Sequence, residues 1–69
     1  MKIRVDYIFN QTKNTTIEYG SQIMYFDDYE YEDLEDGTLK ESELIDLIIK
    51  ALKRQFGYYS IKVTSISEV

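Results

Sequence analysis

The feature that most constrains the fold is one helical pattern in the second half of the chain. Its apolar residues recur at steps of three and four: Leu44, Ile45, Ile48, Leu52 and Phe56. This spacing predicts an amphipathic helix with a core-facing stripe. Acidic residues fall in its first turns and basic residues in its last, as the helix macrodipole favours.

The ends of the helix carry capping signals. Thr38 and Glu41 have capping-box spacing, and Ser42 is a rival N-cap that would start the helix one turn later. Gly57 follows the last apolar residue and is suited to a C-cap. Leu47 and Ile49 widen the apolar arc, which indicates packing across a sheet or contact with a second chain.

The segments around the helix alternate apolar and polar residues with the period of a β-strand. Residues 3–9 predict a first strand, and the polar run 10–14 predicts a hairpin loop. Thr15 to Tyr19 repeat the alternation and predict a second, antiparallel strand that ends at Gly20. Residues 23–26 are a candidate short third strand, and Tyr59 to Thr64 predict the last one.

Together these patterns predict one domain over residues 1–69. Its fold class is α+β: a small antiparallel sheet of three to four strands with one helix packed on one face, in the order β-β-(β)-α-β. A chain of 69 residues buries only about 60% of its unfolded surface, so we expect a stability of a few kcal/mol.

The composition argues against an enzyme or a metalloprotein. The chain has no cysteine and no histidine, which excludes thiolate and imidazole metal sites and removes the usual nucleophile–base pairs. Carboxylates remain, but a domain this small offers no substrate cleft. We therefore expect no catalytic residue and no cofactor.

The N-terminal residues place charge where a signal peptide needs an apolar region, and no apolar run reaches the length of a membrane span. We expect a soluble, cytoplasmic protein without membrane contact.

Charge is distributed unevenly along the chain. Residues 27–46 hold ten carboxylates and one base, Lys40, a net charge of −9, whereas the other 49 residues carry three acids and seven bases, a net charge of +4. Direct binding to nucleic acid is disfavoured, because the densest charge has the same sign as phosphate. A basic partner protein would be attracted instead.

Residues 27–36 are the most acidic part, and their conformation is open between a solvated loop and an extended strand. Tyr29 and Tyr31, which lie among the acids, belong to a residue type enriched at protein interfaces. In an extended chain Asp28, Glu30 and Glu32 would be spaced by about 6.8 Å along one face and could occupy phosphate sites of a basic groove. The candidate partner-binding residues are Asp27, Asp28, Tyr29, Glu30, Tyr31, Glu32, Asp33, Glu35, Asp36, Glu41 and Glu43.

A calcium loop is a further interpretation of the same segment. With Gly37 as the central glycine of an EF-hand, Glu32 and Glu43 would take the first and last ligand positions. Leu34 then stands where a ligand oxygen is required, and no helix precedes the loop. Weak binding of divalent cations by clustered carboxylates stays open.

The run from Asp27 to Asp36, in a short chain without cysteine, resembles small inhibitor proteins of phages and mobile elements. In size, charge and mixing of tyrosine with acid it is similar to anti-CRISPR proteins and other DNA mimics, without a motif matched position by position. The resemblance implies an inhibitor whose acids occupy a nucleic-acid channel, such as that of a Cas nuclease.

The main alternative is a general interaction or dimerisation module. It would use Leu47, Ile49 or an exposed sheet edge and would associate through apolar contacts. The sequence leaves open whether such a partner is a second copy of the chain.

Overall fold

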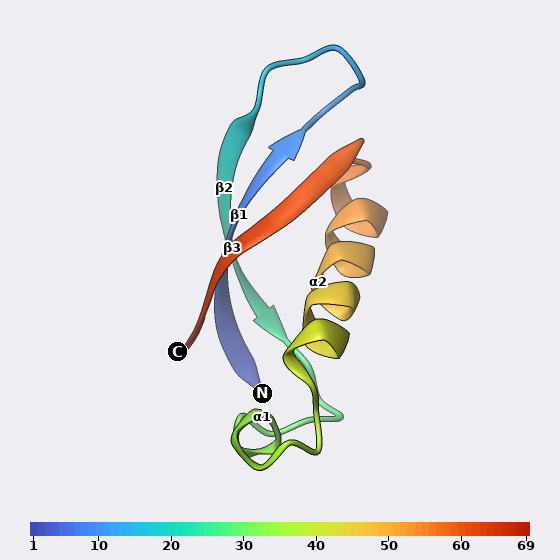
Figure 1. Cartoon of the computed structure of the whole chain (residues 1–69). Coiled ribbons are helices and arrows are strands. Elements are labelled where there is room, and N and C mark those ends of the chain that lie inside the picture. The colour runs from blue at the N-terminus through green and yellow to red at the C-terminus, as the bar shows by residue number, and fades with distance from the viewer.

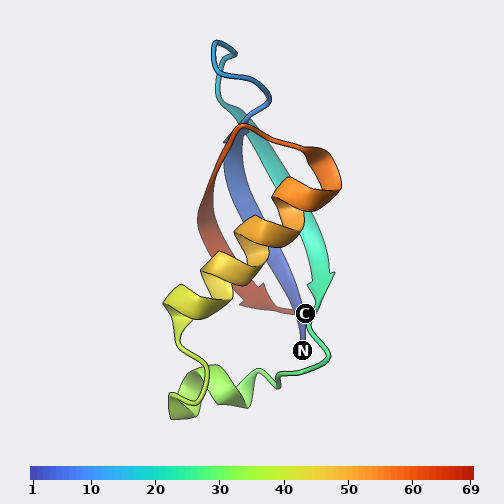
Figure 2. The ribbon, with the colours of Figure 1, turned by 90° about the vertical axis from the view of Figure 1, so that its right-hand side faces the viewer.

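The computed structural model covers residues 1–69 and contains three strands and two helices (Figure 1). The elements are β1 (Lys2–Asn10), β2 (Glu18–Tyr25), α1 (Glu32–Asp36), α2 (Glu41–Phe56) and β3 (Ser60–Glu68). The sheet order is β2-β1-β3, and both edge strands are antiparallel to β1. Helix α2 crosses one face of this sheet, and no element covers the other face (Figure 2). The α+β prediction is confirmed.

The core lies between the sheet and α2. All four residues predicted for the inner face of the first strand are buried, and they meet three residues of the helical stripe and one residue that precedes the helix. The buried residues are Ile3, Val5, Tyr7, Phe9, Leu39, Leu44, Ile48 and Leu52. Full burial stabilises the fold by about 1.5–3 kcal/mol for each large apolar side chain, so this group supplies most of the hydrophobic stabilisation.

Strand β2 differs from its predicted form. It continues through Gly20 and Ser21 to Tyr25, so the predicted end at Gly20 is wrong and residues 23–26 do not form a separate strand. The pairing explains the continuity, because Tyr7 is paired with Gly20. A Cβ atom at residue 20 would lie only 2.6 Å from the Tyr7 ring. Glycine is therefore required here by close packing and does not end the strand.

The apolar alternation of β2 points away from α2. Ile17, Tyr19, Ile23 and Tyr25 are all exposed, with Tyr19 at 87%. The register with β1 places Gly20 and the residues at even positions after it on the helix side. Periodicity predicts a strand correctly but does not indicate which face of the strand meets the core.

The N-cap predicted for α2 is wrong, and the predicted C-cap is confirmed. The N-cap is Lys40, without a side-chain hydrogen bond, so the capping box of Thr38 with Glu41 and the rival cap Ser42 are both wrong. Gly57 is a C-cap as predicted, with φ of 69°, and its N–H donates to the Lys53 carbonyl at 2.8 Å.

Strand β3 contains a β-bulge at Thr64. Val63 is paired with Tyr7 and Ser65 with Asp6, and the Thr64 hydroxyl donates to the Asp6 carbonyl at 3.0 Å. A bulge inserts one residue and thereby changes which positions face inward. Because of it, Val63 and Ile66 both pack against the core although they stand an odd number of residues apart.

The molecule is elongated, with principal extents of 40 × 17 × 17 Å. Helix α1 and the beginning of α2 lie at one end of the long axis (Figure 1). The hairpin loop between β1 and β2, the end of α2 and the beginning of β3 lie at the other end. The acidic segment therefore occupies one end of the molecule.

Candidate functional site

The acidic segment is held to the core by apolar residues that alternate with its carboxylates. Tyr29, Tyr31 and Leu34 are partly buried against the core, and Leu39, which follows, is only 1% exposed. The amino group of Met1 also donates to the carbonyls of Phe26 and Tyr29, both at 2.8 Å. These contacts order the segment.

The segment is helical in its second half, so its interpretation as an extended strand is wrong. Helix α1 begins at Glu32, and Gly37, with φ of 83°, ends it in the left-handed conformation that glycine adopts readily. Asp33 accepts a hydrogen bond from the Glu30 N–H at 2.8 Å through its carboxylate. Asp36 accepts one from the Thr38 N–H at 2.9 Å, and hydrogen bonds from Thr38 lower the pKa of Asp36.

The predicted row of carboxylates along a strand is therefore absent. Asp28 and Glu30 precede α1 in a turn, and Glu32 begins the helix. On α1, Glu32 shares a face with Glu35 and Asp36, because residues three and four apart are neighbours on a helix, about 5–6 Å apart at Cβ. The segment that carries these carboxylates lies at one end of the molecule (Figure 1).

The predicted site residues separate into an exposed set and an anchoring set. Asp33, Tyr29 and Tyr31 are partly buried, and the two tyrosines contact the core. The remaining predicted residues are exposed: Asp27, Asp28, Glu30, Glu32, Glu35, Asp36, Glu41 and Glu43. We call this exposed set, together with the exposed Asp46 of α2, the acidic end.

The acidic end has no cationic neighbours within ion-pair distance. The ion pair in the structure joins Arg4 to Asp6 at 3.4 Å and lies on the uncovered sheet face. Lys40, the N-cap of α2, and the Met1 amino group are cations beside the acidic segment, but neither pairs with a carboxylate. Most bases belong to the hairpin loop, the second half of α2 and the beginning of β3, which lie toward the opposite end (Figure 1) and which we call the basic end: Lys13, Lys50, Lys53, Arg54 and Lys62. The uneven charge of the sequence thus becomes a separation of charge along the long axis.

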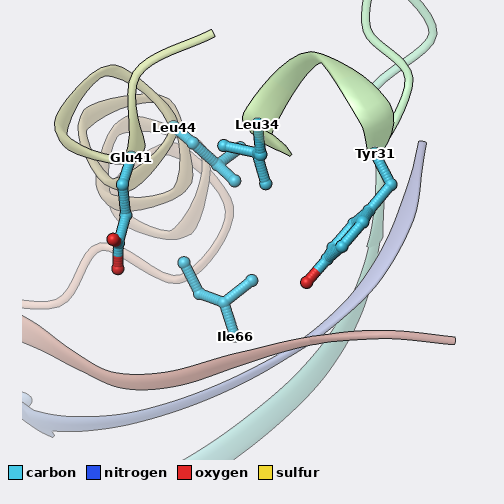
Figure 3. A pocket seen from close by; sticks show the side chains of 5 residues that line it. All are labelled: Tyr31, Leu34, Glu41, Leu44 and Ile66. Carbon is cyan, nitrogen blue, oxygen red and sulfur yellow. The ribbon is translucent and has the colours of Figure 1, made fainter. Parts of the chain in front are cut away.

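A hollow of about 230 Å³ lies beside the acidic end, between α1, α2 and β3. Tyr31, Leu34, Leu44 and Ile66 line it, and the side chain of Glu41 stands on its α2 side (Figure 3). Small-molecule sites have volumes of about 300–1,000 Å³, so this hollow is smaller than such sites. No group of three carboxylates is placed to hold a metal ion.

The sequence reasoning missed the outer surface of β2. Tyr19, Ile23 and Tyr25 form an exposed apolar strip along this edge strand. The Lys2 ammonium lies 5.6 Å from the centre of the Tyr25 ring. The sequence does contain a signal for this surface. The alternation of apolar and polar residues continues past Gly20 to Tyr25, which predicts one long strand instead of two short ones.

Comparison with protein-family models, with curated proteins and with solved structures found no match. No helix is long and apolar enough to cross a membrane.

Proposed function

We propose that the chain is a non-catalytic inhibitor that binds a nucleic-acid-binding protein, such as a Cas nuclease, through the acidic end. The observation that carries the proposal is the concentration of exposed carboxylates at one end of an elongated molecule, where none of them forms an ion pair. A basic groove that normally holds phosphates would supply those cations.

The anchoring of the segment supports this function. Tyr29, Tyr31, Leu34 and Leu39 fix the backbone between the acids, so the carboxylates are presented by an ordered surface. Binding then costs less conformational entropy than binding by a flexible acidic tail would. The separation of charge would also orient the molecule as it approaches a positive surface, with the acidic end first.

The proposal is tested by using the chain as bait in a bacterial lysate at low and high salt. We expect nucleic-acid-binding proteins to be retained at low salt and released at high salt, because exposed charges are screened. The variant Glu30→Lys/Glu32→Lys/Glu35→Lys should retain none of them. These three side chains are exposed and make no hydrogen bond, so we expect the variant to fold, and its circular dichroism spectrum should match that of the original chain.

The single variant Glu32→Lys has a matched control in Glu18→Lys, which makes the same change of charge at the start of β2, away from the acidic end. The control should retain the same proteins as the original chain. If the triple variant and the original chain capture the same proteins, the acidic end is not the binding surface.

A further inference from the structure

The uncovered edge of the sheet at β2 carries four residues that are free to pair. The Met1 amino group donates to the Phe26 carbonyl, and the Phe26 N–H donates to the Met1 carbonyl, both at 2.8 Å. Hydrogen-bonded and non-hydrogen-bonded pairs alternate along an antiparallel ladder. The backbone groups that point away from β1 are therefore those of Tyr19, Ser21, Ile23 and Tyr25.

This edge lacks the features that normally prevent pairing. The other edge strand, β3, has a bulge at Thr64 and carries the charged residues Lys62 and Glu68. Strand β2 has a regular register, no proline, and one charged residue, Glu18, at its beginning. Long, regular and apolar edges are sites where another strand adds to the sheet.

From these features we propose that β2 pairs antiparallel with β2 of a second copy and forms a symmetric dimer with a six-stranded sheet. The twofold axis passes beside Gln22. Tyr19 then lies opposite Tyr25 of the second copy, and Ser21 lies opposite Ile23 of the second copy. All four residues with outward backbone groups find partners within the strand, and two aromatic cross-strand pairs form.

The charge distribution selects this orientation. Strand β2 runs from the basic end toward the acidic end (Figure 1). Antiparallel pairing places the acidic end of each copy beside the basic end of the other, whereas a parallel arrangement would bring the two acidic ends together. The dimer thus supplies charge complementarity that each copy lacks within itself.

The surface area that the β2 edge can bury in this dimer is close to the minimum for a stable interface. Tyr19 and Tyr25, which are 87% and 67% exposed, offer on the order of 300 Å² per copy at about 200 Å² per ring. A standard interface buries about 600–800 Å² per partner. Ile17, Ile23 and the backbone of β2 supply the remainder, so we expect a reversible dimer that dissociates on dilution.

Sedimentation equilibrium of the purified chain tests the proposal. We expect a mass of twice 8.2 kDa at high concentration, falling toward 8.2 kDa on dilution. Ile23→Lys should remain monomeric, because it adds a charge to the strip at the paired edge. Ser65→Lys adds the same charge to β3, opposite Asp6, and should dimerise like the original chain.

Disulfide trapping tests the register, and the natural absence of cysteine makes each introduced thiol unique. Gln22→Cys should form a disulfide-linked dimer under oxidation. Residues opposite each other in a non-hydrogen-bonded pair have Cα atoms about 4.5 Å apart, within the range that a disulfide spans. Ser65→Cys on β3 should remain unlinked.

A monomer at every concentration would overturn the proposal and leave the edge to a strand of a different protein. A dimer that survives Ile23→Lys, with no disulfide at Gln22→Cys, would overturn the assignment to β2. Both experiments need no partner protein and substitute no residue of the acidic end, so they can fail without affecting the proposed function; in the dimer, a basic partner would compete with the basic end of the second copy for the acidic end.

Discussion

The contact between Gly20 and Tyr7 allows the fold to be tested by one methyl group. In Gly20→Ala the new Cβ would lie 2.6 Å from Cε2 and Cζ of the Tyr7 ring, so the ring must retreat by about 0.8 Å to reach the ordinary contact distance of 3.4 Å. Tyr7 is only 2% exposed, and Phe9 and Tyr58 lie beside it, with ring centres 5.7 and 6.3 Å away. The ring therefore has little room to move.

The free-energy change can be worked from this geometry. Overpacking a core costs about 1–3 kcal/mol. Alanine recovers about 0.5–1 kcal/mol because it loses less backbone entropy than glycine does. The difference spans about 0–2.5 kcal/mol, and because the buried ring has little room to move we expect a net loss in the upper part of that range, about 1–2 kcal/mol. The total free energy of unfolding is roughly 3–10 kcal/mol for a chain of this length.

The assay is urea unfolding followed by circular dichroism. With a slope of about 1 kcal/mol per molar urea, the midpoint of Gly20→Ala should fall by about 1–2 M. In a Tyr7→Leu background, where the ring is absent, the same substitution should cost little. An unchanged or higher midpoint, or an equal loss in both backgrounds, would refute the argument from close packing.

Three further predictions concern stability. Burial raises the pKa of Tyr58 above its ordinary value of 10.0, so the folded chain keeps that proton at a pH where the unfolded chain loses it. The stabilisation is complete below pH 10.0 and is lost as the pH rises through the higher folded value, so Tyr58→Phe should flatten this loss in alkaline unfolding curves. Leu39→Ala should cost about 2–5 kcal/mol by leaving a cavity, and amide exchange should then increase in the acidic segment. Gly57→Ala should cost about 1–2 kcal/mol in thermal unfolding, because φ is 69° there, and Gly57→Asn should cost less.

The sequence was sufficient to predict the elements with strong periodicity. The four inner residues of β1 are buried as their alternation indicates, and Leu44, Ile48 and Leu52 of α2 are buried as their helical spacing indicates. The two other residues of the predicted stripe are not buried, since Ile45 is partly exposed and Phe56, at the end of the helix, is exposed. Gly57 was predictable as a C-cap, since a helical stripe ends immediately before it. In these cases the local pattern and the tertiary packing favour the same structure.

The errors arose where a tertiary contact or a competing local hydrogen bond overrides the pattern. Gly20 has the properties of a turn residue, but it lies within β2 because the Tyr7 ring occupies the space of its missing side chain. Thr38 and Glu41 have capping-box spacing, but the Thr38 N–H bonds to Asp36 and the helix begins with Lys40 as its cap. The contact with Tyr7 cannot be inferred from spacing along the chain, whereas the hydrogen bond from Thr38 to Asp36 is a local turn that competes with the capping box.

The candidate site was predictable in composition but not in shape. The charge count identified the carboxylates correctly as one concentrated group, and the structure brings them to one end. Their helical arrangement was not foreseeable, because repulsion among acids disfavours order. Tyr29, Tyr31 and Leu34 decide the conformation by packing against the core.

The proposed function rests on competition between the acidic end and nucleic acid for the same basic groove. The most direct test takes a nucleic-acid-binding protein captured by the chain and measures its affinity for a labelled duplex as the chain is added. We predict that the chain displaces the duplex, that displacement weakens as salt rises, and that Glu30→Lys/Glu32→Lys/Glu35→Lys displaces nothing. A ternary complex in which the captured protein holds both the chain and the duplex at undiminished affinity would contradict the proposal.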